Sequence, residues 1–194
     1  MLQLDLVTVD MMSYKEVEIT ITPSSAHING ENIVLNPSDR GILFDLYQKY
    51  AKGYSKFFKM DMLSQLGFVG AEILLQHHPL IAEQHEDCAL IFGNSYSSIK
   101  NDMDYLKTIT SADNYYPSPS LFVYTLPNIV TGEIAIRHKL YGETCFYVLE
   151  NKEQLFELAN TQIHLTNLSA ALIGWVECEN ENNYYANIKL LWKN

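Results

Sequence analysis

Strand-like and helix-like segments alternate along this chain, and the alternation limits its fold more than any other feature. Residues 15–21 place apolar side chains at every second position, the period of a strand with one face in water. Later apolar runs short enough for strands lie at residues 88–92, 144–149, 170–176 and 185–192. Because helical patterns separate most of them, we expect an α/β fold with a mixed, mostly parallel sheet and helices on both faces.

The strongest helical pattern covers residues 60–76, where apolar side chains recur with helical spacing. Gly67 and Gly70 lie inside it, and a glycine within a helix costs about 1 kcal/mol relative to alanine. We therefore expect this helix to pack closely against another element. Further helices are predicted at residues 43–54, from Pro119 onward, at 128–137 and after Asn151.

Short polar motifs predict where elements turn or begin. The Asn-Gly pair at 29–30 is a hairpin signal. Ser38 or Asp39 can cap the helix expected from residue 43. Asn151 followed by Gln154 resembles a capping box with Asn at the N-cap, so a helix is expected to begin there.

The chain length of 194 residues fits one domain, residues 1–194, with a core that needs no disulfide or metal. Cys88, Cys145 and Cys178 are odd in number and widely spaced, so neither a disulfide framework nor a zinc site is predicted. The sequence also lacks the common nucleotide, dinucleotide and metallohydrolase motifs. We expect no metal and no cofactor.

The formal charge of −10 opposes binding to nucleic acid and to anionic membranes. Lys49, Lys52, Lys56 and Lys59 come closest to a basic cluster, and their spacing predicts one shared helix face. That face is either a solvated surface or a docking patch for an acidic partner. No apolar stretch approaches the roughly 20 residues of a membrane span, and no secretory signal is present, so we expect a cytoplasmic protein.

Residues 117–177 carry the most informative motifs. Asn128 and Gly132 precede Ile-Ala-Ile at 134–136, a glycine turn follows at 142, and Ala-Leu-Ile-Gly comes later at 171–174. In this order they resemble the N-terminal half of β-ketoacyl synthases, the thiolase-like condensing enzymes. Phe-Gly-Asn-Ser at 92–95 is similar to an earlier strand end of that family. The likeness spans residues 28–178 and implies a thiolase-like half.

The resemblance places the nucleophilic cysteine of condensing enzymes at Asn151. An amide cannot hold an acyl chain as a thioester, although it can cap the helix that would lower the pKa of a thiol. Cys145 lies six residues earlier in the expected strand and fits a small buried apolar residue better than a substitute nucleophile. Full synthases also carry catalytic histidines in a second half, which we do not find. We therefore expect no enzyme activity.

Noncatalytic relatives of these enzymes, the chain length factors, pair with an active synthase and shape its acyl cavity. Short versions accompany aryl-polyene and flexirubin-type pigment synthesis. The resemblance thus implies a subunit that pairs with a ketosynthase, or with itself, in fatty-acid or polyketide-type synthesis. Docking of an acyl carrier protein on the lysine face is a further expectation.

Two other functions stay open at this point. The chain could form a homo-oligomer that binds an acyl chain or an acyl carrier protein without a synthase. It could also be an unrecognised hydrolase built on Ser95, Ser97 and a histidine. Analogy of fold alone does not distinguish these two functions from that of a subunit that pairs with a synthase.

Residues 144–149 are the expected interface. In condensing enzymes the corresponding strand pairs antiparallel with its equivalent in the other subunit. The run is uncharged and consists of Thr144, Cys145, Phe146, Tyr147, Val148 and Leu149. Such a run at a sheet edge recruits other strands. A fully buried central strand is the alternative, because periodicity does not separate the two.

Overall fold

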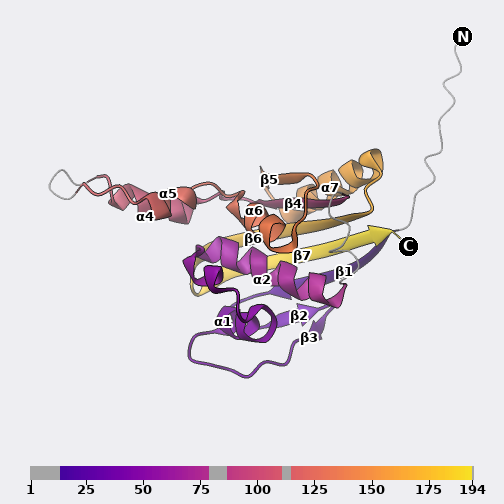
Figure 1. Ribbon diagram of the computed structural model, residues 1–194, viewed down its shortest axis with the longest axis horizontal. Coiled ribbons are helices and arrows are strands. Elements are labelled where there is room, and N and C mark those ends of the chain that lie inside the picture. Colours follow the sequence, from indigo (N-terminus) through magenta and orange to yellow (C-terminus); the bar gives the residue numbers. More distant parts are fainter. Residues whose placement is uncertain (1–13, 79–86, 111–114, 194) are drawn as a thin grey trace, which may run out of the picture.

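The computed structural model describes residues 14–78, 87–110 and 115–193. A seven-stranded sheet in the order β3-β2-β1-β7-β6-β4-β5 forms its centre (Figure 1). The strands are β1 (Tyr14–Ile21), β2 (Ala26–Ile28), β3 (Glu31–Asn32), β4 (Cys88–Asn94), β5 (Thr144–Val148), β6 (Ala170–Asn180) and β7 (Asn183–Lys193).

The sheet is mixed, as expected, but it is not mostly parallel. Only β4 runs parallel to its neighbours, β5 and β6. The remaining pairings, β1 with β2 and β7, β2 with β3, and β6 with β7, are all antiparallel. For β1 to β3 and for β6 to β7 the reason is local, because these strands are joined by short turns and a short turn allows only antiparallel neighbours. The pairing of β1 with β7 joins distant segments and has no such local cause.

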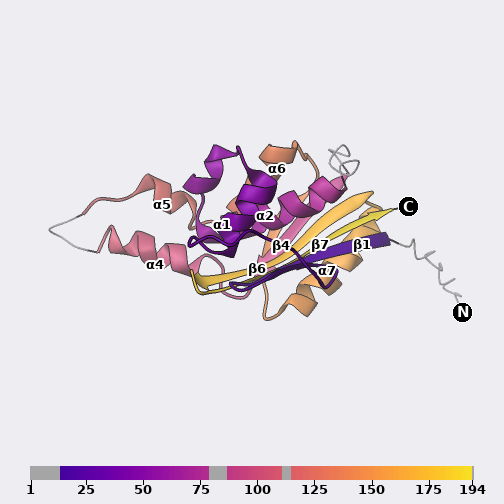
Figure 2. The ribbon, with the colours of Figure 1, turned by 90° about the horizontal axis from the view of Figure 1, so that it is seen from below.

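Helices cover both faces of the sheet, as the alternation predicted (Figure 2). One face carries α1 (Ile42–Leu46), α2 (Met62–His77) and α6 (Ile129–His138), and the other carries α7 (Lys152–Thr166). A short π-helix, η1 (Tyr47–Ala51), and a 3₁₀-helix, η2 (Ser55–Lys59), lead from α1 to α2. Two more helices, α4 (Ile99–Lys107) and α5 (Pro119–Val123), project from the body as an arm (Figures 1 and 2).

The helix α2 packs as its glycines predicted. A Cβ on Gly67 would collide with Val130 of α6, and a Cβ on Gly70 would collide with Ile188 of β7. The carboxylate of Asp61 caps the helix by accepting from backbone N–H groups in its first turn. Close approach to two elements therefore explains both glycines.

The hairpin and the capping motif at Asn151 are confirmed, but the cap proposed for the first helix is wrong. Asn29 and Gly30 both adopt positive φ between β2 and β3, as a two-residue hairpin turn requires. The N-cap of α1 is Gly41, which makes no side-chain cap bond. Ser38 instead directs its hydroxyl and backbone N–H to the carboxylate of Asp45 inside α1.

The arm helix α4 was not predicted, although its sequence carries a signal for it. Ile99, Met103 and Leu106 recur with the spacing of an amphipathic helix face. At the root of the arm, the Ser98 hydroxyl donates to the Thr125 carbonyl at 2.6 Å. This contact joins the two chain segments that leave the body.

Candidate functional site

The strand β5 forms one edge of the sheet. It pairs with β4 on one side and has no neighbour on the other among the described strands. The alternative of a fully buried central strand is therefore wrong. Val148, near the end of β5, is 55% exposed.

The backbone of β5 has a defined inner and outer side. The backbone N–H of Leu90 donates to Glu143 at 2.8 Å, and the N–H of Leu149 donates to Asn94 at 2.9 Å. Since groups alternate along a parallel ladder, odd-numbered residues of β5 bond to β4. Thr144, Phe146 and Val148 consequently direct their N–H and C=O groups to the open edge. This edge can accept a further strand.

The side chains of β5 alternate between the two faces of the sheet. Phe146 packs against the core beneath α2 and α6, whereas Cys145 and Tyr147 pack on the side of α7. All three are only partly buried. A neighbouring strand would cover apolar area on both faces of the sheet.

The arm adds a second exposed apolar surface. Tyr105 of α4 packs on Phe122 of α5, with ring centroids 5.3 Å apart. The outward-facing apolar side chains of the arm are Ile99, Met103, Leu106, Phe122, Val123 and Leu126. Exposed apolar clusters of this kind mark interaction sites.

Asn151 is the N-cap of α7, as predicted. Its Oδ1 accepts from the backbone N–H of Gln154 at 3.1 Å. The Gln154 side chain accepts from the N–H of Glu150 at 3.1 Å, one residue earlier than an ideal capping box. The amide oxygen of Asn151 is thus used in holding the first turn of α7.

None of the three cysteines, all in the described part of the chain, is placed to act as a thiolate. Burial raises the pKa of Cys88 to about 12 and that of Cys178 to about 11. Burial also raises the pKa of Cys145, whose Sγ points to the Leu90 carbonyl. A protonated thiol is a poor nucleophile.

The serine and histidine arrangement of a hydrolase is not assembled. The hydroxyl and backbone N–H of Ser95 donate to the carboxylate of Glu177 on β6. The N–H of Ser97 donates to the Asn94 side chain at 2.7 Å. Among the described residues, no hydrogen bond joins either serine to a histidine.

The four lysines do not share a helix face, so that premise of the sequence analysis is wrong. Lys49 lies in η1, Lys52 follows its end, and Lys56 and Lys59 lie in η2. The helix ends at Ala51 because Lys52 leaves the helical region with ψ of 128°, and Gly53 then turns the chain with φ of +100°.

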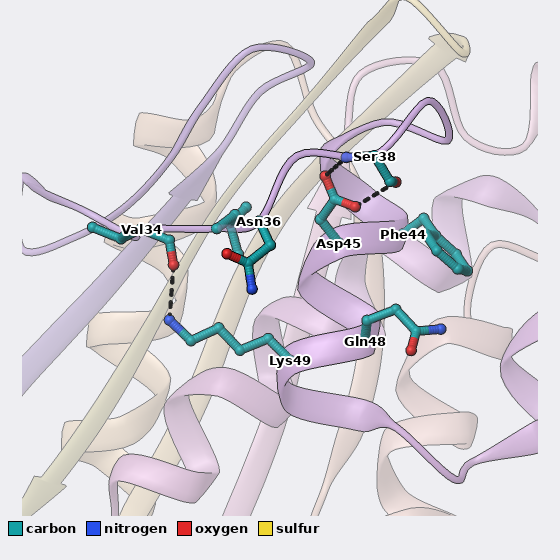
Figure 3. Close-up of a pocket in the computed structure, with 8 residues that line it drawn as sticks. Val34, Asn36, Ser38, Phe44, Asp45, Gln48 and Lys49 are labelled. Atoms are coloured by element: carbon teal, nitrogen blue, oxygen red, sulfur yellow. Dashed lines mark hydrogen bonds between the residues drawn. The ribbon is translucent and has the colours of Figure 1, made fainter.

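Two of these lysines also have partners within the chain. Lys49 donates to the Val34 carbonyl at 3.0 Å, beside a pocket of about 400 Å³ (Figure 3). The same figure shows the hydrogen bonds from Ser38 to Asp45 on the other side of that pocket.

The second of these lysines, Lys56, forms an ion pair with Glu133 at 2.7 Å. Lys52 and Lys59 are exposed, and no ion pair to them is found in the described residues.

The described residues meet the requirements of neither a metal centre nor a membrane-spanning helix. No group of three or more His, Cys, Asp or Glu side chains in the described residues could hold a metal ion. In that same part of the chain, no helix is long and apolar enough to cross a membrane.

This sheet and its helices form the thiolase-like fold of ketosynthases and chain length factors, as the resemblance implied. The chain superimposes on one chain of the structure of a ketosynthase in complex with its chain length factor from Xenorhabdus doucetiae, with a TM-score of 0.60 and 14% identity, covering 94% of this chain and 79% of that one. For the ishigamide ketosynthase/chain length factor the TM-score is 0.65 at 17% identity, covering 91% and 61%.

A third similar structure is a type II polyketide synthase acyl-carrier protein in complex with its ketosynthase bound to the hexaketide. Its TM-score is 0.59 at 14% identity, covering 76% of this chain and 50% of that one. No protein-family model matches the sequence. No curated protein matches it either.

Proposed function

We propose that this chain is a noncatalytic, chain-length-factor-like subunit that pairs with an active ketosynthase through β5. The open edge of β5 carries the proposal. Thr144, Phe146 and Val148 present backbone groups there that no described strand pairs with, next to partly exposed apolar side chains. A strand from a second subunit would satisfy those groups and continue the sheet.

The exposed apolar side chains of the arm fit the same partner. Large exposed apolar side chains are unfavourable in water, and an interface or an acyl chain would cover them. We place the arm against the partner subunit, where it would help to enclose the acyl chain. The product would be of the aryl-polyene or flexirubin type.

The absence of catalysis is supported at the position of Asn151. Its amide caps α7 and offers no thiolate, and burial raises the pKa of Cys88, Cys145 and Cys178. These four residues therefore offer no thiolate on which a thioester intermediate could form. The alternative, a homo-oligomer that binds acyl chains or an acyl carrier protein, would use the same edge with a second copy of this chain.

Co-expression with each ketosynthase encoded nearby, followed by affinity purification, tests the pairing. We expect one ketosynthase to co-purify in a one-to-one complex. Val148→Pro removes an N–H that points to the open edge and leaves the ladder to β4 intact, so it should abolish co-purification without unfolding the chain. Tyr147→Pro is the matched control, because it removes a donor to β4 and should lower the melting temperature.

Tyr147→Lys gives an independent check. The side chain lies on the α7 side of the edge strand, so a lysine there can extend into water in the free subunit but not in a joined sheet. We expect a folded chain without a partner. A variant that still associates with unchanged melting temperature would contradict the proposal, as would co-purification of Val148→Pro at the wild-type level.

A further inference from the structure

Glu133 on α6 is a buried carboxylate that forms one ion pair among the described residues. The residue is 7% exposed, and its Oε1 lies 2.7 Å from Nζ of Lys56 in η2. Its Oε2 is buried and has no hydrogen-bond partner among the described residues. The Lys56 side chain is 45% exposed, so water and ligands reach the cation but not the carboxylate.

The other charged groups of this region have partners of their own. On the same helix, Arg137 Nε and His138 Nε2 each lie 2.9 Å from Oε1 of Glu72, a residue that is 1% exposed. Nε2 of His138 makes no hydrogen bond among the described residues in spite of this short distance. Arg137 is thus engaged with Glu72, and Lys56 is the cation in contact with Glu133.

The negative charge of Glu133 acts on two tyrosines that face it. The pKa values of Tyr54 and Tyr124 are both raised, first by burial and second by the negative charge of Glu133. Neither hydroxyl is a cation, so neither can replace Lys56. A buried carboxylate that loses its only cation is strongly unfavourable.

The helix α6 also lies next to the start of the edge strand. It ends at Lys139 in the left-handed region, with φ of +55°, and Leu140 donates back to Ala135 at 3.0 Å. Thr144 begins β5 only a few residues later, and α6 packs on both β4 and β5. A change in the position or stability of α6 would therefore alter the stability of β5.

Residues 40–59, here called the basic segment, would attract an anionic ligand. They contain Arg40 and four lysines against one acidic residue, Asp45, in a chain whose formal charge is −10. The carboxylate of Asp45 already accepts from Ser38. An acidic peptide or protein that approaches this segment competes with Glu133 for Lys56.

We propose that the ion pair between Lys56 and Glu133, here called the latch, couples anion binding at the basic segment to the stability of α6 and β5. An anionic ligand that binds Lys56 breaks its ion pair with Glu133 and leaves that carboxylate buried without a cation. The local stability of α6 and of the edge strand β5 then falls. Because coupling between two sites is reciprocal, a partner strand that binds and stabilises β5 should weaken the affinity of Lys56 for an anion. This coupling goes beyond pairing with a synthase, and it is testable on the chain alone.

Hydrogen–deuterium exchange of the purified chain at low ionic strength tests the latch, with a ten-residue polyglutamate peptide as the anionic probe. We expect the bound peptide to accelerate exchange of residues 129–148 about fivefold or more, within the usual range of coupling between sites. Exchange in β1 and β7 should stay unchanged. Lys56→Gln should accelerate the same residues without peptide.

Glu133→Gln keeps the shape of the side chain and removes the buried charge. It should bind the peptide at least as tightly as the wild type, and its α6 and β5 should no longer respond. Lys59→Gln, at an exposed position of the same segment, should weaken peptide binding yet keep the response. The latch is refuted if the peptide does not bind, if residues 129–148 do not respond, or if Glu133→Gln responds as the wild type does.

Discussion

Nε of Arg137 on α6 lies 2.9 Å from Oε1 of Glu72 on α2, and this ion pair joins two of the helices that cover one face of the sheet. Burial alone would raise the pKa of Glu72. The contacts with His138 and Arg137 outweigh burial and hold that pKa below its ordinary value of 4.5. Ionised Glu72 therefore stabilises the fold above about pH 4.5, and this contribution is lost as the pH falls through the lower pKa of the folded state.

We predict that Glu72→Gln lowers the free energy of unfolding by about 1–3 kcal/mol at pH 7. The difference from the wild type should shrink below about pH 4.5, because protonated Glu72 no longer attracts Arg137. Urea unfolding at pH 7, 5 and 3.5 measures it. Glu153→Gln, an exposed carboxylate at the start of α7, is the control and should change little. A difference that stays constant down to pH 3.5 would contradict the assignment.

Gly67→Ala should destabilise the chain, whereas Gly132→Ala should stabilise it. A Cβ at Gly67 collides with Val130, and overpacking costs about 1–3 kcal/mol, more than the helix propensity gained. A Cβ at Gly132 meets nothing within 4 Å, so the gain of about 0.5–1 kcal/mol is kept. Thermal unfolding compares the two. Equal effects of both substitutions would show that α2 and α6 do not pack as described.

The purified chain should form no acyl adduct when it is incubated with an acyl thioester at neutral pH. Asn151 offers no thiolate, and burial raises the pKa of the three cysteines. Intact-mass spectrometry detects any adduct. Asn151→Cys is the positive control, because the N-terminus of α7 favours a thiolate. A stable adduct on any residue of the wild-type chain would overturn the noncatalytic assignment.

Reversing Lys52 and Lys59 to Glu should weaken binding of an acidic acyl carrier protein roughly tenfold at low salt and much less at high salt. These two lysines are chosen because Lys56 is bound to Glu133, so its reversal would also disturb α6. Fluorescence titration at two salt concentrations measures the affinity. Lys15→Glu with Lys107→Glu changes the net charge equally, away from the basic segment. If the wild type and the Lys52/Lys59 variant bind the acyl carrier protein with equal affinity at low salt, the basic segment is an ordinary solvated surface.

Several motifs that depend on near neighbours in the sequence were predicted correctly, but the cap at Ser38 or Asp39 was not. The cap at Asn151, the hairpin at Asn29 and the helix at 60–76 each follow from a few adjacent residues or from one repeating period. The lysine face failed for a local reason as well. Lys52 leaves the helical region and Gly53 then adopts a positive φ, so the helix that the spacing assumed ends at Ala51.

The amino-acid sequence by itself determined most of the kinds of element, the cap of α7 and the hairpin turn at Asn29, because these depend on local propensity and on the identity of neighbouring side chains. Only the tertiary structure decided that β5 is an edge strand, since sheet order depends on pairings between distant residues such as β4 with β6. It likewise brought Lys56 to Glu133, far apart in the chain. No period or motif records such contacts, because they arise only when the helices pack on the sheet.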